Sequence, residues 1–166
     1  MHSDFLNQIL EKRGFTDEEE IAKFLNPNYE TDMFDPFLMR DMDKSVSRIR
    51  EAIKQNQKIV IYADYDCDGI PGAVILAQLF KKIKYENFEV YIPERNSEGY
   101  GLNFEAIEDF RIRGVNLIIT IDLGITAIEE VTLANSYGIE VIITDHHLPR
   151  TTLGEKGIES LDLPKA

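Results

Sequence analysis

Carboxylate and imidazole side chains follow three apolar runs of the sequence. The runs IVIYADYD (59–66), LIITID (117–122) and VIITDHH (141–147) each lead from branched apolar residues into aspartate or histidine. Asp68 adds one more carboxylate just after the first run. This mixture of oxygen and imidazole ligands suits Mn²⁺ well and also accepts Mg²⁺. A structural zinc site fits less well, because such sites use several thiolates and the chain has one cysteine.

The chemistry open to such a cluster depends on a bound cation. Carboxylates that lie close together repel one another, and each raises the pKa of its neighbours unless a cation is present. Two divalent ions bridged by one aspartate activate water and stabilise the charge of an in-line displacement at phosphorus. Asp122 stands alone after the middle run and is our candidate for the bridge.

Apolar strands and amphipathic helices alternate in the second part of the chain, which predicts a parallel, Rossmann-like α/β sheet flanked by helices. The predicted strands cover 58–63, 88–92, 117–121 and 141–144, and the predicted helices cover 72–84, 104–113 and 125–137. Asn103 is an expected N-cap, and Gly138 is an expected C-terminal cap. The carboxyl ends of parallel strands share one edge, so Asp64, Asp122 and Asp145 are expected to converge there.

The first part of the chain is predicted to be a short helical extension. Apolar residues at helical spacing indicate a first helix around 5–10, a second that ends at Asn26-Pro27-Asn28, and a third over 41–55. Thr16 is the expected N-cap of the second helix, because the acidic residues Asp17, Glu18 and Glu19 follow it. The expected organisation has three parts: a helical extension at 1–55, the α/β domain at 56–150, and a divergent or disordered tail at 151–166.

Composition limits the class of protein. The net charge of −12 argues against a stand-alone nucleic-acid clamp, which should be basic, but it leaves room for a metal-dependent enzyme that acts on phosphodiesters. The single cysteine, Cys67, fits a reducing cytosol. No run of about 20 apolar residues is present, and the N-terminus lacks a signal-peptide pattern. We therefore expect a cytoplasmic protein that has no membrane partner.

The first acidic motif has one structural alternative. A D-x-D-x-D-G run also occurs in calcium-binding loops of the EF-hand type. Such a loop lies between two helices and has an acidic residue at its twelfth position, whereas DYDCDG (64–69) follows a predicted strand. The pair of adjacent histidines is a weak signal alone, so the hypothesis of a metal centre depends on all three runs together.

Four segments of the chain resemble motifs of the DHH family of phosphoesterases. They are DYDCDG (64–69), RNSEGYGL (95–102), TIDLGIT (120–126) and TDHHLP (144–149). The EGYGL element is similar to the RecJ-type members, and the likeness covers residues 20–150. The resemblance implies a hydrolase, namely a 5′-to-3′ exonuclease on single-stranded DNA. It also implies two Mn²⁺ or Mg²⁺ ions, a role in DNA repair and recombination, and repair proteins among the partners.

The resemblance also assigns roles to individual residues. The expected metal ligands are Asp64, Asp66, Asp68, Asp122, Asp145 and His146. The expected catalytic set is Asp66, Asp68, Asp122, His146 and His147, and the expected phosphate contacts are Arg95, His147, Gly99 and Gly101. Asp64, Asp145 and His147 are open to three roles, which are ligation, orientation of a ligand, and phosphate contact. Tyr100 is open to stacking on a base or to a place in the core.

The likeness to the family stops after DHHLPR. A RecJ-type enzyme continues into a fourth motif and a nucleic-acid-binding domain, so the resemblance implies a truncated form with an incomplete DHH domain. Two alternatives to the nuclease stay open. One is a DHH phosphoesterase that acts on short oligonucleotides or cyclic dinucleotides. The other is an inactive DHH-like interaction module.

Overall fold

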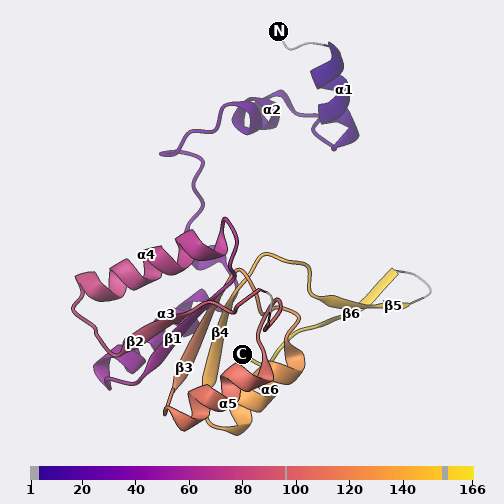
Figure 1. The fold of residues 1–166 in the computed structure, drawn as a ribbon. Coiled ribbons are helices and arrows are strands. Elements are labelled where there is room, and N and C mark those ends of the chain that lie inside the picture. The colour runs from indigo at the N-terminus through magenta and orange to yellow at the C-terminus, as the bar shows by residue number, and fades with distance from the viewer. Residues whose placement is uncertain (1–3, 96, 155–156) are drawn as a thin grey trace. The chain divides into compact units, whose positions relative to one another are not determined.

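The computed structural model describes residues 4–95, 97–154 and 157–166, and these form two units, Met1–Asp43 and Lys44–Ala166. The first unit contains α1 (Asp4–Lys12), α2 (Glu18–Leu25) and the 3-10 helix η1 (Pro36–Leu38) (Figure 1). Leu10 of α1 is buried, and the rings of Phe15 and Phe24 pack with their centroids 4.6 Å apart. This unit is therefore a small helical assembly with little core of its own.

An aspartate begins α2, and the prediction of Thr16 as its N-cap was wrong. The side chain of Asp17 accepts hydrogen bonds from the backbone N–H groups of Glu19 and Glu20, each at 2.9 Å. A carboxylate caps a helix better than a threonine hydroxyl, and its charge also favours the positive end of the helix dipole. The helix consequently starts one residue later than the sequence pattern indicated.

The second unit contains a four-stranded parallel sheet with the strand order β2-β1-β3-β4. The strands are β1 (Ile59–Ala63), β2 (Phe88–Tyr91), β3 (Leu117–Ile121) and β4 (Glu140–Thr144). The helices that pack with the sheet are α3 (Met42–Lys54), whose first two residues precede the unit boundary, α4 (Gly69–Lys82), α5 (Phe104–Ile112) and α6 (Ile128–Ser136). After β2 the chain crosses to the other side of β1. The switch in strand order therefore lies between β1 and β3, where open α/β sheets bind their ligands.

Alternate residues of each inner strand enter two separate hydrophobic cores. Val60 and Tyr62 of β1 pack with α5 and α6 on one face. Ile59, Ile61 and Ala63 pack with α3 and α4 on the other face, so the helices cover both sides of the sheet (Figure 1). All five residues of β1 are fully buried. The prediction of a doubly covered parallel sheet is confirmed, and such coverage explains why these strands are continuously apolar.

Helix α3 packs with the sheet, whereas the sequence placed it in the N-terminal extension. Ala52 is fully buried in the core that contains Ile59, and Ile49 and Ile53 pack against the same core. The boundary between the two units accordingly falls after Asp43 and not after residue 55. Helical spacing of apolar residues predicts that a helix has a buried face, but it does not tell which layer that face will join.

Two smaller elements differ from expectation. The expected divergent or disordered tail at 151–166 includes two paired antiparallel strands, β5 (Arg150–Gly154) and β6 (Gly157–Asp162). Helix α6 starts at Ile128 and not at residue 125, because a turn with Gly124 at φ +111° comes first. Asn103 caps α5 as predicted, with its side chain accepting from the N–H of Ala106 at 2.7 Å.

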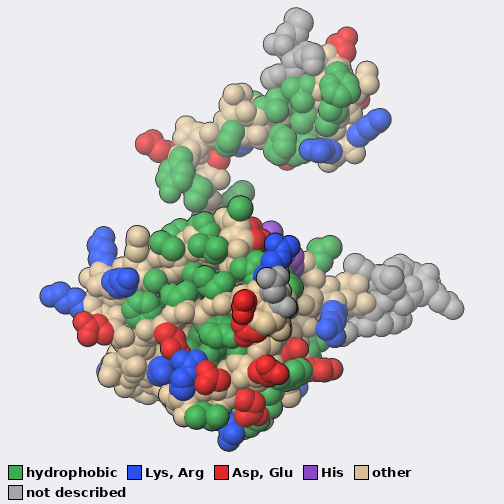
Figure 2. Space-filling model, viewed as in Figure 1, with side chains coloured by type: hydrophobic (Ala, Val, Ile, Leu, Met, Phe, Trp, Pro, Cys, Tyr) green, Lys and Arg blue, Asp and Glu red, His purple; other side chains and the backbone are tan. Residues whose placement is uncertain are grey.

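Helix α4 shows an apolar surface as well as a buried one. Ala73 and Phe80 enter the core, while a second set of apolar side chains on or next to the helix is exposed, namely Ile70, Val74, Ile75, Leu79 and Ile83. In the view of Figure 2, hydrophobic side chains gather over this helix. Among the described residues, no helix combines the length and the apolar character needed to cross a membrane.

Candidate metal centre

Three carboxylates stand next to one another where the central strands end. Ala63, Ile121 and Thr144 are aligned across β1, β3 and β4 as the last paired residues. The next residues are Asp64, Asp122 and Asp145. The ladder extends into them, because the N–H of Asp64 donates to the carbonyl of Ile121 at 3.1 Å and the N–H of Asp122 donates to the carbonyl of Thr144 at 2.8 Å. Register alone therefore produces the expected convergence.

Asp122 occupies an unfavourable backbone and side-chain environment. Its φ is +63°, a left-handed conformation that residues other than glycine seldom adopt and that is concentrated at functional sites. The residue is 6% exposed, and neither of its carboxylate oxygens accepts a hydrogen bond of normal geometry from the described residues. The Nε2 atom of His146 lies 2.9 Å from Oδ1. A buried carboxylate that lacks hydrogen-bond donors is well suited to bind a metal ion.

The electrostatic surroundings of Asp122 favour the same conclusion. Burial raises the pKa of Asp122, and the negative charges of Asp68 and Asp66 raise it further, while the two histidines partly oppose the change. Burial and the negative charges of Asp68 and Asp66 both penalise the ionised form in the absence of a cation. A divalent ion would reverse the penalty, because it supplies the positive charge that the surrounding protein lacks.

The loop DYDCDG presents the carboxylates that follow β1. Asp64 is 3% exposed, and its Oδ1 accepts from the N–H of Tyr65 at 2.7 Å. Asp66 accepts from the N–H of Gly69 at 3.1 Å and from the N–H of Asp68 at 3.2 Å, and these bonds lower the pKa of the exposed Asp66 carboxyl. A Cβ atom on Gly69 would lie 2.5 Å from the carbonyl oxygen of Asp64. Glycine is therefore required for this tight turn.

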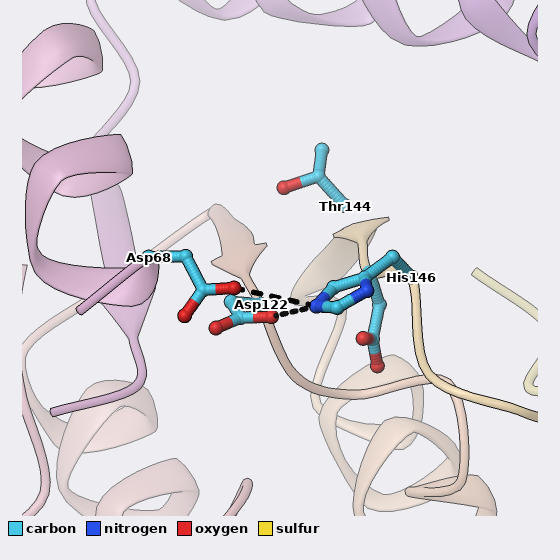
Figure 3. A pocket seen from close by; sticks show the side chains of 5 residues that line it. Asp68, Asp122, Thr144 and His146 are labelled. Carbon is cyan, nitrogen blue, oxygen red and sulfur yellow. Dashed lines mark ion pairs between the residues drawn. The ribbon is translucent and has the colours of Figure 1, made fainter. Parts of the chain in front are cut away.

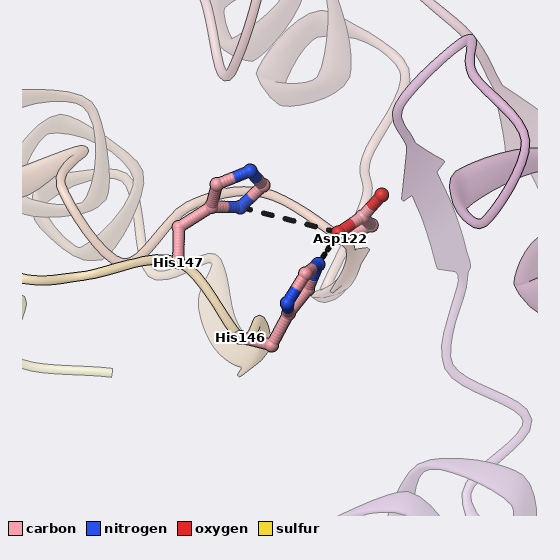
Figure 4. Close-up of side chains that lie close together, drawn as sticks. All are labelled: Asp122, His146 and His147. Carbon is pink, nitrogen blue, oxygen red and sulfur yellow. Dashed lines mark ion pairs between the residues drawn. The ribbon is translucent and has the colours of Figure 1, made fainter. Parts of the chain in front are cut away.

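Two groups of ligand atoms meet at Asp122. In each group the ligand atoms lie within 4.8 Å of one another. One group is Asp122 with His146 and His147 (Figure 4), and the other is Asp122 with Asp64 and Asp66. Asp122 belongs to both groups, which is the arrangement that a bridging ligand between two ions requires. Oxygen and imidazole ligands in these numbers fit Mn²⁺ or Mg²⁺.

The site opens into a pocket of about 310 Å³, lined by Asp68, Asp122, Thr144, Asp145 and His146. Figure 3 shows the imidazole of His146 directed toward the carboxylates of Asp68 and Asp122. The distance from His146 Nε2 to Asp68 Oδ2 is 3.5 Å. Asp68 therefore lies at the rim of the centre, next to one ligand group, without being a member of either group.

Asp145 orients other groups and is outside both sets of ligand atoms. One oxygen accepts from the N–H of Ile125 at 2.9 Å. The other accepts from the N–H of His147 at 3.0 Å and lies 2.7 Å from the His147 Nδ1 atom. Although burial opposes it, these hydrogen bonds lower the pKa of Asp145, and the same contact raises the pKa of His147. The geometry thus favours orientation over ligation, two roles that the sequence left open.

The expected phosphate contacts lie around the rim. The guanidinium of Arg95 sits 5.3 Å from the centre of the Tyr65 ring, beside the first acidic loop. Gly99 and Gly101 have φ values of +81° and +90°, and open space surrounds the position of a Cβ atom on each. The backbone of this loop is accordingly accessible, as the prediction of substrate contact requires.

The sequence left open whether Tyr100 stacks on a base or lies in the core. It is 54% exposed, and its hydroxyl donates to the carbonyl of Asp122 at 3.3 Å and lies 3.5 Å from the Nδ1 atom of His147. Burial and then the negative charge of Asp145 raise the pKa of Tyr100 to about 12. Its place in the EGYGL element was the available signal, but the contact with Asp122 follows only from the folded loop.

Comparison with known proteins agrees with this geometry. The model of the DHH family, N-terminal domain, matches residues 58–162, which is more than half of the chain. The chain belongs to the DHH family. All of the strand ends described above lie within the part that matches this family.

Several relatives within the DHH family carry the name single-stranded-DNA-specific exonuclease RecJ. The protein from Bacillus subtilis (strain 168) is 43% identical over 85% of this chain and 18% of its own length. The protein from Escherichia coli (strain K12) is 35% identical over 68% of this chain and 19% of its own length. This DHH chain therefore spans about a fifth of the length of the curated relatives it matches.

Solved structures of RecJ share the fold of this DHH chain. A crystal structure of exonuclease RecJ bound to manganese is 32% identical, with a TM-score of 0.63, and the match covers 69% of this chain and 29% of that one. RecJ from Thermus thermophilus in complex with Mn²⁺ is 25% identical, with a TM-score of 0.61, and the match covers 93% of this chain and 20% of that one.

Proposed function

We propose that this chain is the metal-binding part of a RecJ-type exonuclease, which hydrolyses single-stranded DNA from the 5′ end. The observation that carries the proposal is the position of Asp122, a buried carboxylate shared by two groups of potential ligand atoms. Carboxylates that cluster on a protein surface without a function do not require one buried carboxylate that belongs to two groups. The identity to relatives named as single-stranded-DNA-specific exonucleases supports the choice of substrate.

The proposed cofactor is a pair of Mn²⁺ or Mg²⁺ ions. His146 and His147 would hold one ion, Asp64 and Asp66 the other, and Asp122 both. The manganese bound in the two related structures supports this assignment. Bound ions of this kind supply an activated water and neutralise the charge that develops on the phosphate. Asp68, at 3.5 Å from His146, completes the acidic rim.

The remaining residues of the site position the ligands and the substrate. Asp145 fixes the ring of His147 through its Nδ1 atom, and the same atom lies 3.9 Å from Oδ1 of Asp122. Arg95 stands beside the acidic loop, where its planar guanidinium suits a phosphate oxygen pair. The open backbone at Gly99 and Gly101 allows a DNA strand to approach closely.

The cellular setting is part of the same proposal. An exonuclease of this kind would work in DNA repair and recombination, in the cytoplasm, and with repair proteins among its partners. The net charge of −12 is unfavourable for holding a polyanion. Binding of long DNA therefore has to depend on the ions, on Arg95 and on local contacts at the rim, rather than on the overall charge.

A comparison of substrates tests the proposed function. With Mn²⁺ present, we expect the chain to shorten a single-stranded oligonucleotide that carries a label at its 3′ end. The products should form a ladder that retains the label, because digestion starts at the 5′ end. A blunt duplex of the same sequence should resist, since its 5′ end is paired and cannot enter a site of this size.

The same experiment separates the proposal from its alternatives. Rapid hydrolysis of dinucleotides or cyclic dinucleotides, with no action on the long strand, would replace the exonuclease by a phosphoesterase for short substrates. Binding of a protein partner without hydrolysis of any of these substrates would instead indicate an interaction module. Chelation by EDTA is the control for dependence on metal, and it should stop the reaction completely.

A further inference from the structure

A tyrosine hydroxyl lies deep in the sheet, below the loop that carries Tyr100. Tyr62 of β1 is fully buried, and its ring packs on Tyr91 and Phe110 with centroids 5.0 Å and 6.1 Å away. A phenylalanine would fill this space equally well. The hydroxyl group therefore needs another explanation, because burying a polar group is unfavourable unless it forms hydrogen bonds.

The hydroxyl of Tyr62 binds both the loop and the helix that follows the loop. It donates to the carbonyl of Gly101 at 2.9 Å, and it accepts from the Nδ2 atom of Asn103 at 3.1 Å. The side chain of Asn103 also caps α5 by accepting from the N–H of Ala106. The hydroxyl thus acts as donor to one residue and as acceptor from another, which satisfies it although it is buried.

Glu98 fixes the other end of the loop through hydrogen bonds. Its Oε1 accepts from the hydroxyl of Tyr91, and its Oε2 accepts from the N–H of Glu94 at 2.7 Å. The Nδ2 atom of Asn103 lies 3.5 Å from Glu98 Oε1 and joins the two halves. The hydroxyl groups of Tyr62 and Tyr91, whose rings pack together, therefore both form hydrogen bonds with the segment 98–103.

Between Glu98 and Gly101, the loop places Tyr100 beside the candidate metal centre. Gly99 and Gly101 flank it with left-handed φ values, which no other residue adopts without strain. The hydroxyl of Tyr100 reaches the carbonyl of Asp122 at 3.3 Å, and its ring meets the ring of His147 edge-on at 6.1 Å. Gly101, which accepts the hydrogen bond from Tyr62, is thus the residue directly after Tyr100.

We propose that the Tyr62 hydroxyl is a positioning group that acts through Gly101 on Tyr100, and thereby sets how tightly the substrate strand is held beside the metal centre. The inference rests on the proposed function of this site. It adds a core residue whose hydroxyl forms its hydrogen bonds with Gly101 and Asn103. Tyr62 has no part in the chemistry, and its effect is confined to the placement of the loop.

The test is Tyr62→Phe, which removes the hydroxyl and keeps the ring. We expect KM for single-stranded DNA to rise about five- to tenfold, the loss that follows from one buried hydrogen bond. We expect kcat and the affinity for Mn²⁺ to stay within about twofold, because the ions are held by other loops. The matched control is Tyr85→Phe. Tyr85 is also buried and donates to the carbonyl of Gln57, but it lies in the core on the other face of the sheet.

A double variant tests the route of the effect. In a Tyr100→Ala background, Tyr62→Phe should change KM by less than about twofold, because the residue through which it acts is gone. An unchanged KM in Tyr62→Phe, an equal rise in Tyr85→Phe, or an undiminished effect in the Tyr100→Ala background would each overturn the proposal.

Amide hydrogen exchange separates this inference from the proposed function. Tyr62→Phe should accelerate exchange at residues 99–102, and Tyr85→Phe should leave it unchanged. If exchange accelerates while the wild-type chain neither binds nor cuts DNA, then the anchor is real and the proposed function is wrong. If exchange in the loop is the same in all three proteins, then the positioning role is refuted, whatever the substrate.

Discussion

Asp122→Asn lowers the rate of Mn²⁺-dependent hydrolysis by about 10³-fold or more. The side chain keeps its size, but it loses the charge through which both ligand groups would hold their ions. Metal ions contribute several kcal/mol to the stabilisation of charge in reactions of this class, and each 1.36 kcal/mol corresponds to a factor of about ten in rate. The measurement is a single-turnover assay on labelled single-stranded DNA at saturating Mn²⁺.

A matched variant shows whether the loss is specific. Asp43→Asn removes one negative charge from an exposed position in the first turn of α3. Its rate should stay within about twofold of the wild-type rate, since an isolated surface charge has little effect on distant chemistry. Equal rates for the wild type and Asp122→Asn would refute a catalytic role for the centre.

In the absence of metal, the same Asp122→Asn substitution makes the protein more stable at pH 7. The wild-type chain then buries a carboxylate that has no hydrogen bond of normal geometry from the described residues, and such a group destabilises the folded state by about 1–2 kcal/mol. Asparagine carries no charge and avoids most of this cost. We expect the melting temperature in EDTA to rise by about 3–6 °C, as measured by circular dichroism.

The gain in stability depends on pH in a defined direction. The folded-state pKa of Asp122 is raised above its ordinary value of 3.8, so the folded wild-type protein binds this proton more tightly than the unfolded chain does. The penalty for the charge is present in full above the raised pKa, and it disappears as the pH falls through that value. The difference between the two melting temperatures should therefore be largest at pH 7 and shrink toward pH 4. A variant that is less stable than the wild type at pH 7 would contradict the prediction.

Sequence patterns could predict the site where backbone register determines it. Each of the apolar runs ends one residue before an aspartate, and parallel pairing then aligns Asp64, Asp122 and Asp145 without further information. A rule about the carboxyl edge of parallel sheets was enough for that part. The rule also located His146, because it follows Asp145 directly.

Other features depend on contacts between distant residues, which no local pattern records. The left-handed φ of Asp122 and the role of Asp145 as a partner of His147 arise only when three loops are folded together. Tyr100 reaches the centre because Tyr62 holds its loop from another strand. Helix α3 was assigned to the wrong unit for the same reason, since its periodicity does not name its partner.

The central claim is that Asp122 is shared between two divalent ions, and calorimetric titration with Mn²⁺ tests it most directly. We expect the wild-type chain to bind two ions, and we expect Asp122→Asn to weaken both of them, because both ligand groups lose the same member. Asp43→Asn should bind as the wild type does. No binding by the wild-type chain at tens of micromolar Mn²⁺, or unchanged binding of both ions by Asp122→Asn, would contradict the claim.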